Sequence, residues 1–519
     1  MKPPCDDAVL LYAPAGTPCR EAAAPWILAA TILASSMTFI DGTVVNVALP
    51  VLQSSLGATV VDVQWVVESY ALFLGALILV GGSAGDLFGR RRVFLGGTIL
   101  FAAASAWCGF APTIRQLQVA RAVQGIGAAF LVPGSLAIIS ASFDAKSRGK
   151  AIGTWSAFTS ITTAIGPVLG GWLIEHASWR WAFFINPPIA AAVVLLTLWQ
   201  VPESRSATAR RIDWLGALAV TLGLGGLVFG FLESTSLGWR HPAVCGSLTL
   251  GAICLLAFLR IEARERFPMV PLELFRSPAF SGANLLTLFF YAALGMFFFL
   301  YPLNLIQVQG YTATATGAAA LPLILLMFSL SRWSGGLVDR YGPRPPLILG
   351  PLIAAAGFLL FALPSLASSY WTAFFPAFLV LGFGTAVTVA PLTTVVMGAV
   401  VQDRAGTASG INNAVSRVAG LLSVALLGLV MVAAFRHQLE HRLAGIPIPS
   451  SAHRALMADS IRLAAIKLPP ELDATASAAV KASVQQSFVS AFRLEMFLCA
   501  VLAVCSSAGA CWMIRDAKQ

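Results

Sequence analysis

Long apolar stretches separated by short polar connections dominate the chain. A helix needs about 20 apolar residues to cross the hydrocarbon core of a bilayer, and these stretches lack the strict alternation of barrel strands. The pattern predicts fourteen membrane-spanning helices, so we expect an all-α polytopic membrane protein. The predicted spans lie near 25–49, 62–84, 93–111, 115–139, 150–174, 181–201, 214–232, 242–260, 279–304, 315–337, 346–363, 370–398, 407–434 and 488–514.

One connection is much longer than the rest. Residues 435–487 place Leu and Ala at helical spacing with Arg, Lys and Glu between them, before a break at Pro469-Pro470. This spacing is typical of amphipathic helices that lie on a surface.

Composition supports a membrane protein and argues against several other classes. Hydrophobic residues make up 58% of the chain and charged residues 11%, whereas soluble domains average about 25% charged residues. The net charge of +10 is scattered between apolar segments, so no nucleic-acid partner is expected. The eight cysteines form no Cys-x-x-Cys pair, and no metal site is expected.

The distribution of basic residues predicts the orientation. The short loops and tails on the side of both termini hold 20 Lys and Arg, while the opposite short loops hold three, at Arg115, Arg180 and Arg240. Positive residues near span ends are retained in the cytoplasm. Both termini are therefore predicted to be cytoplasmic, with residues 435–487 outside.

A sequence repeat divides the chain. The segment GSAGDLFGRR at 82–91 recurs as GGLVDRYGPR at 335–344, an offset of 253 residues, and 149–153 resembles 406–410 at an offset of 257. Each offset covers eight spans, so both copies share one orientation. Six helices, an inserted pair and six more helices explain this, and such parallel repeats are typical of transporters.

These boundaries predict five regions. They are a cytoplasmic tail at 1–24, an N-terminal six-helix half at 25–201, two inserted helices with linkers at 202–278, a C-terminal six-helix half at 279–514 that includes the external loop 435–487, and a cytoplasmic tail at 515–519.

The repeated loop is predicted to be a conformational latch. Its glycines allow a tight turn, and Asp86 can meet an arginine or the positive end of a helix. A simple basic anchor would explain the arginines but not the repeated Gly-Asp-Gly spacing. The latch residues are Gly82, Asp86, Gly89, Arg90 and Arg91, with Asp339 and Gly342 in the second copy.

Asp41, Glu68 and Arg121 each fall well inside a predicted span. A charge there costs at least about 2.5 kcal/mol unless it is paired or faces a water-filled cavity, and is a functional candidate by default. Asp41 or Glu68 near Arg121 could load and release a proton. The alternative is a static salt bridge that fixes helix packing.

Several motifs resemble those of the major facilitator superfamily, specifically its 14-helix drug:proton antiporters of the multidrug-resistance efflux type. The resemblance covers nearly the whole chain except 1–24 and most of 435–487. One departure is Thr162, where the family often has glycine, which predicts looser helix packing. The motifs are FIDGTVVNVALP (39–50), QWVVESYAL (64–72), RAVQGIGAA (121–129), Gly166-Pro167-x-x-Gly170-Gly171, SWRWAFFINPP (178–188) and RAGTASGINNAVSRVAG (404–420).

This resemblance implies the major facilitator fold and a drug:H⁺ antiporter in the bacterial inner membrane, acting as a monomer on small molecules and protons. It also implies that Gly166, Pro167, Gly170 and Gly171 control helix bending. No cofactor is expected because the proton gradient supplies the energy. The chain has no G-x-x-x-x-G-K-[ST] loop and no hydrolase motif, so it is not expected to be an enzyme. The alternatives are an exporter of one endogenous metabolite or antibiotic, and a non-transporting receptor or sensor.

Polar and aromatic positions within the spans are candidates for the substrate cavity. Phenylalanine-rich runs around Tyr291 could bind planar cations, although packing explains most of these rings. For Asn412, Asn413 and Arg417, polar contact between helices is an equal alternative. The candidates are Asn46, Trp65, Gln124, Tyr291, Asn412, Asn413 and Arg417.

Overall fold

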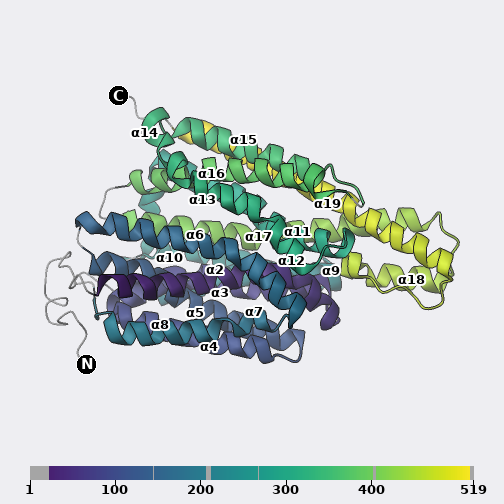
Figure 1. Cartoon of the computed structure of the whole chain (residues 1–519), viewed down its shortest axis with the longest axis horizontal. Coiled ribbons are helices and arrows are strands. Elements are labelled where there is room, and N and C mark those ends of the chain that lie inside the picture. The colour runs from purple at the N-terminus through teal and green to yellow at the C-terminus, as the bar shows by residue number, and fades with distance from the viewer. Residues whose placement is uncertain are drawn as a thin grey trace. The chain divides into compact units, whose positions relative to one another are not determined.

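A computed structural model describes residues 23–143, 145–205, 212–266, 268–366, 368–400 and 405–514, with some side chains inside these ranges left undescribed. The described chain is almost entirely helical (Figure 1). The helices of its first part are α2 (Ala24–Ser55), α3 (Val60–Phe88), α4 (Arg90–Phe110), α5 (Ile114–Ser142), α6 (Ala145–His176), α7 (Trp181–Phe184), α8 (Asn186–Gln200), α9 (Trp214–Leu237) and α10 (Pro242–Arg264).

The remaining helical segments begin with a short 3-10 turn, η1. They are η1 (Leu272–Arg276), α11 (Pro278–Leu303), η2 (Asn304–Val308), α12 (Ala313–Ala319), α13 (Leu321–Gly335), α14 (Leu337–Tyr341), α15 (Arg344–Phe361), η3 (Tyr370–Phe374), α16 (Phe375–Gly398), α17 (Ala405–Leu443), α18 (Ser450–Ala458), η5 (Asp459–Ala465) and α19 (Ala474–Met513).

All fourteen predicted spans are helical. Among the described residues, thirteen helical segments are long and apolar enough to cross a membrane. Helix α6 covers the remaining predicted span, 150–174. The predicted all-α polytopic architecture is therefore confirmed.

Contacts between Cα atoms divide the chain into two compact units. Unit 1 takes the described residues of 1–45, 69–225 and 250–273, and unit 2 takes those of 46–68, 226–249 and 274–519. The boundaries cut through α2, α3, α9 and α10. One end of each of these helices therefore groups with the second half of the chain in unit 2. The predicted five regions stay a prediction.

In unit 1, glycines let α4 and α5 approach closely. A Cβ atom added at Gly97 would lie 2.8 Å from the backbone nitrogen of Leu131, and one at Gly127 would lie 2.6 Å from that of Phe101. No side chain fits in so narrow a space. Small residues at such crossings give helices in membranes their closest van der Waals contact.

In unit 2, an aromatic cluster fills the core where α11, α15 and α16 meet. The ring of Phe297 lies 4.7 Å from that of Phe361 and 6.0 Å from that of Phe378, and it stacks on Tyr301 at 5.4 Å. All four side chains are buried. These rings stabilise the packing of unit 2.

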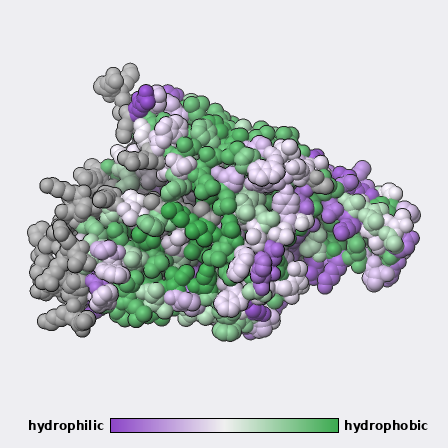
Figure 2. Space-filling view, in the orientation of Figure 1, coloured by the Kyte–Doolittle hydropathy of each residue, from purple (hydrophilic) through white to green (hydrophobic). Residues whose placement is uncertain are grey.

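Helices α17 and α19 extend beyond their predicted spans. On α17 the extension buries Phe435, Leu439 and Leu443 while Arg436 and Glu440 are exposed. The amphipathic character predicted for this region is therefore present, but much of it continues the two long helices. Helix α18 lies next to these extensions (Figure 1), where hydrophilic and hydrophobic residues are mixed at the surface (Figure 2).

The segment η5, which follows α18, docks on the end of α2 and on the connection that follows it, both in unit 2. Gln53 Nε2 donates to the carbonyl of Arg462 at 3.0 Å, and the Arg462 guanidinium reaches the carbonyl of Ala58 at 3.5 Å. Gln307 Nε2 donates to Gln53 Oε1 at 2.8 Å. The buried Leu463 has a φ of +54°, a costly conformation for a branched side chain. Tertiary contacts therefore hold η5 in place.

Candidate functional site

The carboxylate of Asp41 lies at the centre of a buried polar network in unit 1. Arg121 Nη1 contacts Asp41 Oδ2 at 2.6 Å, and Gln124 Nε2 donates to Asp41 Oδ1 at 2.8 Å. Arg121 also donates to Gln124 Oε1 at 2.8 Å. Asp41 and Gln124 are fully buried and Arg121 is 1% exposed. The structure thus brings together one of the two predicted acids, the predicted arginine and a predicted cavity residue.

Two further polar residues, which the sequence did not single out, complete the network. Asn186 Nδ2 donates to Asp41 Oδ1 at 3.1 Å and to Ser105 Oγ at 2.9 Å. Ser105 Oγ in turn donates to the carbonyl of Phe183 at 2.9 Å. Asn186 lies in the motif SWRWAFFINPP, where an amide within an apolar run was the signal that could have identified it.

An aromatic ring covers the guanidinium of Arg121. The Arg121 Cζ atom lies 4.1 Å from the centroid of the Tyr70 ring on α3. The helices approach closely here, because a Cβ atom at Gly125 would overlap the Tyr70 backbone. Arg121 therefore combines an ion pair with a cation–π contact.

The other predicted acid, Glu68, has a different environment. It belongs to unit 2 and is fully buried on α3, and neither carboxylate oxygen has a hydrogen-bond partner in the described part of the chain. One turn away, Gln64 Nε2 donates to the carbonyl of Val424 on α17 at 3.2 Å. Glu68 is an unpaired buried acid, and its predicted role in proton coupling stays a prediction.

The predicted antiporter helix is α6, and its glycines face α2. A Cβ atom at Gly166 would overlap Thr43 Oγ1, and one at Gly170 would lie 2.6 Å from Val44 Cγ1. Pro167 and Gly171 are also buried. These glycines let α6 pack closely against the part of α2 that carries Asp41.

The departure at Thr162 creates a polar contact with the same helix. Thr162 Oγ1 donates to Ser36 Oγ at 3.0 Å, and Trp155 Nε1 donates to Ser35 Oγ at 3.1 Å. Hydrogen bonds thus join α6 to α2 where the family often has glycine. The sequence alone suggested only looser packing.

At the predicted latch, Asp86 pairs with an arginine of the next helix. Arg90 Nε donates to Asp86 Oδ1 at 2.9 Å, and Arg90 Nη2 lies 2.8 Å from the same oxygen. Gly89, between α3 and α4, has a φ of +111°, which strongly favours glycine. Gly82 packs normally against Pro133. The glycine at 89 is therefore required by the turn itself.

Glu203, after α8, contacts this turn, and the sequence reasoning did not identify it. Its Oε1 accepts a hydrogen bond from the backbone nitrogen of Arg91 at 3.1 Å, and a Cβ atom at Gly89 would overlap its carboxylate. A carboxylate at the first turn of α4 suits the positive end of that helix. The Arg91 side chain donates to the carbonyl of Leu198 at 2.9 Å.

The second copy of the latch preserves the turn. Gly342 follows α14 with a φ of +80°, as Gly89 follows α3 with a positive φ. The side chain of Asp339 lies outside the described part of the structure.

The remaining cavity candidates occupy several environments in unit 2. Trp65 Nε1 donates to Glu233 Oε1 of α9 at 3.0 Å. Tyr291 on α11 and Arg417 on α17 are both half-buried. Asn46 is half-buried. Their predicted contact with substrate stays a prediction.

Asn412 joins two helices. Its Nδ2 donates to Thr287 Oγ1 at 2.6 Å and to Asn284 Oδ1 at 3.1 Å, both on α11. The neighbouring Asn413 is exposed. The geometry favours interhelical contact for Asn412.

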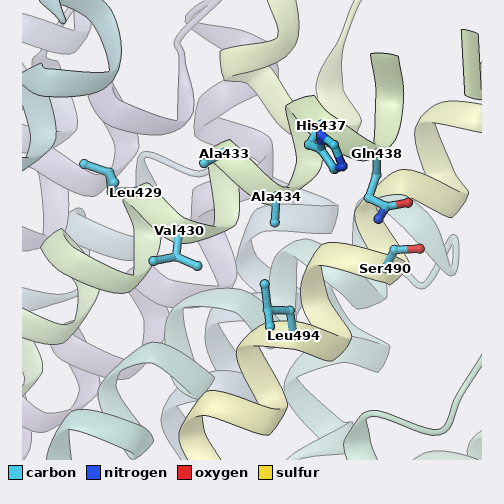
Figure 3. A pocket seen from close by; sticks show the side chains of 8 residues that line it. All are labelled: Leu429, Val430, Ala433, Ala434, His437, Gln438, Ser490 and Leu494. Atoms are coloured by element: carbon cyan, nitrogen blue, oxygen red, sulfur yellow. The ribbon is translucent and has the colours of Figure 1, made fainter. Parts of the chain in front are cut away.

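A mostly apolar groove of about 580 Å³ lies between α17 and α19 in unit 2 (Figure 3). It shares no residue with the Asp41 network, and none of the predicted cavity residues lines it. Its lining residues are Leu429, Val430, Ala433, Ala434, His437, Gln438, Ser490 and Leu494. Within the described residues, no group of three or more His, Cys, Asp or Glu side chains could hold a metal ion.

Similarity to known proteins agrees with this architecture. The chain is 39% identical to the multidrug resistance protein Stp of Mycobacterium tuberculosis over 430 residues, covering 82% of this chain and 79% of that protein. It is 29% identical to the tetracenomycin C resistance and export protein of Streptomyces glaucescens over 496 residues, covering 93% and 90%.

Solved structures show the same fold. A bacterial homologue of the human lysosomal transporter Spinster, in an inward-facing and unoccupied conformation, superposes with a TM-score of 0.63 at 18% identity, covering 94% of this chain and 98% of that one. The sequence model of the Major Facilitator Superfamily matches residues 31–424. The chain therefore belongs to the major facilitator superfamily of transporters.

Proposed function

We propose that this protein is a proton-coupled exporter of lipophilic, cationic small molecules. It acts as a monomer in the bacterial inner membrane, with both termini cytoplasmic, and uses alternating access. The observation that carries the proposal is the fully buried Asp41 bound to Arg121, Gln124 and Asn186. Relatives named for multidrug resistance and for resistance with export of an antibiotic support this class of substrate.

The network offers a way to couple a proton to conformation. Protonation of Asp41 would remove its negative charge and weaken its attraction to Arg121, which stays charged at all relevant pH values. The Arg121 guanidinium and the Gln124 amide could then rearrange, and α2 and α5 with them. A proton entering from outside would thus promote substrate release, with the proton gradient as the energy source.

The surrounding helices are suited to transmit such a change. Gly166 and Gly170 place α6 against α2 within about two turns of Asp41. Gly89, Asp86 and Glu203 fix the connection between α3 and α4. A movement of α2 would shift α6, because the two helices are in close contact. The predicted latch would limit the accompanying movement of α3 and α4.

Everted membrane vesicles with an acidic interior test the proposal. Substrates of an antiporter should dissipate the pH gradient in wild-type vesicles, and Asp41→Asn should abolish this response at an equal amount of protein. Glu440→Gln, which neutralises an exposed acid on α17, is the matched control and should behave like wild type. A wild-type response in Asp41→Asn would contradict the coupling role of Asp41.

A second candidate is a dedicated exporter of one antibiotic or endogenous metabolite, because one relative is named for a single compound. A panel of lipophilic cations, neutral antibiotics and small metabolites separates the two. Responses to many unrelated cations favour the multidrug exporter, and a response to one compound favours the dedicated exporter. Binding of compounds without any transport would indicate a receptor or sensor.

A further inference from the structure

Unit 2 holds a second buried acid that the transport scheme above does not use. Glu495 lies on α19, seven residues inside the predicted span 488–514, and is fully buried. Neither of its carboxylate oxygens has a hydrogen-bond partner among the described residues. This environment contrasts with that of Asp41, whose two oxygens are both bonded.

The register of the neighbouring helices places Glu495 at the level of the aromatic cluster. Ser506 Oγ donates to the carbonyl of Leu286 on α11, and Ser507 Oγ donates to that of Ile348 on α15. Because both helices run antiparallel to α19, this register brings Glu495 opposite Phe297 and close to Phe361. These two rings lie 4.7 Å apart in the apolar core of unit 2.

The elements packed against α19 supply few charges at this level. Helix α11 carries no Lys, Arg, His, Asp or Glu, and its ionisable groups are Tyr291 and Tyr301; η2 carries none of these charged residues. The only charged residue of α15 is Arg344, which bonds the carbonyl of Cys511, four turns along α19 from Glu495. Cys499, one turn along α19 from Glu495, is fully buried.

The charged groups of α17, η5 and α19 are bonded to other residues, exposed, or distant from Glu495 along their helices. Arg442 bonds Gln486 and Ser490, and Arg462 pairs with Asp459 within η5. Near the level of Glu495, Arg436 and His437 on α17 and Arg493 on α19 are exposed, and Arg493 bonds the carbonyls of Leu363 and Pro364. The other charged or titratable residues of these helices are Arg417, Glu440 and His441 on α17 and Lys481 on α19. The described residues therefore provide no bonded cation for Glu495.

A buried carboxylate without a partner is very costly, whereas the neutral acid is not. We propose that Glu495 is a second proton-binding residue of the transport cycle and holds its proton in this conformation. The inference rests on the proposed function, proton-coupled export. In the cycle, rearrangement of α19 would expose the Glu495 carboxyl to water, which would accept the proton, and reprotonation would precede the return to the buried state.

The proposed site lies near the groove between α17 and α19, through which water would reach it. Ser490 and Leu494, just before Glu495, line the groove between α17 and α19 (Figure 3). The extensions of these helices are on the predicted external side. A modest rotation of α19 would turn Glu495 toward the groove, so a proton could be exchanged with that side.

Infrared difference spectroscopy of the purified protein tests whether Glu495 holds a proton. Stepping from neutral to strongly alkaline pH should deprotonate buried acids and reduce the carbonyl band of neutral carboxylic acids. Glu495→Gln should lose one component of this band, and the exposed control Glu440→Gln should keep it. An unchanged band in Glu495→Gln would overturn the proposal, independently of any transport measurement.

Reconstituted proteoliposomes test the role in transport. We expect Glu495→Gln to lower the number of protons moved per substrate exported, and Glu495→Asp to restore it. A wild-type ratio in Glu495→Gln would overturn the coupling role. If wild-type protein moved substrate without protons, the proposed function would fail instead, while the infrared band would still decide whether Glu495 is protonated.

Discussion

Asp41 and Glu495 are both fully buried acids on apolar helices, yet their surroundings are opposite. Asp41 in unit 1 contacts the guanidinium of Arg121 and accepts hydrogen bonds from Gln124 and Asn186. Glu495 in unit 2 has no hydrogen-bond partner among the described residues. Burial is therefore equal, and the neighbours decide whether the acid is held as a charged pair or as a neutral group.

The comparison also distinguishes two ways in which the protein can hold a buried acid that binds a proton. In unit 1 the charged form is stabilised by a cation and amide dipoles, so protonation must break existing interactions. In unit 2 the neutral form fits the apolar core, so deprotonation must wait for water or a cation. Four substitutions test this contrast, beginning with the one expected to destabilise the protein most.

Removing the cation should have the largest effect. Arg121→Ala leaves Asp41 buried without a counter-charge, and breaking such a pair costs about 3–5 kcal/mol. We expect little correctly folded protein in the membrane and no gradient-driven efflux. Quantitative immunoblotting of membranes and an efflux assay would measure both.

Arg115→Ala is the matched control for this substitution, because Arg115 is an exposed arginine on the same helix, α5. It should leave protein level and efflux unchanged. If Arg121→Ala were as stable and active as this control, the Asp41 network would not be essential.

Removing one amide from the network should have an intermediate effect. Asn186→Ala deletes a donor to the Asp41 carboxylate, and hydrogen bonds to charged groups contribute about 1.5–3 kcal/mol. Thermal unfolding in detergent should show lower stability, and the pH dependence of efflux should shift. A stability loss without any such shift would assign Asn186 to packing alone.

A neutral polar contact in unit 2 should contribute less. Asn412→Ala removes the bonds to Asn284 and Thr287, and a neutral hydrogen bond contributes about 0.5–1.5 kcal/mol. If Asn412 only joins α17 to α11, stability falls while the KM for substrate is unchanged. A raised KM with wild-type stability would instead indicate substrate contact.

The smallest effect on stability is expected for Glu495. Glu495→Gln replaces a neutral acid by a neutral amide of similar size, so the free energy of unfolding should change by less than about 1 kcal/mol. Asp41→Asn is the matched substitution in unit 1 and should be far more destabilising, since it leaves Arg121 uncompensated. Equal losses in chemical denaturation of the two variants would remove the contrast between the units.

The sequence alone determined the fold class, because membrane helices obey a strong local rule. An apolar stretch of about 20 residues must satisfy its backbone hydrogen bonds internally and so forms a helix. The same logic identified Asp41, Glu68 and Arg121, since a charge in an apolar run is conspicuous. Gly89 was also predictable, because the repeated turn needs a residue that tolerates positive φ.

Only the tertiary structure decided which of these residues meet. Asp41 and Arg121 are 80 residues apart, and Asn186 and Glu203 gain their roles from helices distant in sequence. The sequence analysis did not single out Glu495. Its lack of a partner depends on how α11, α15 and α17 pack around α19, and burial and pairing of this kind are properties of the packed helices, which no local pattern contains.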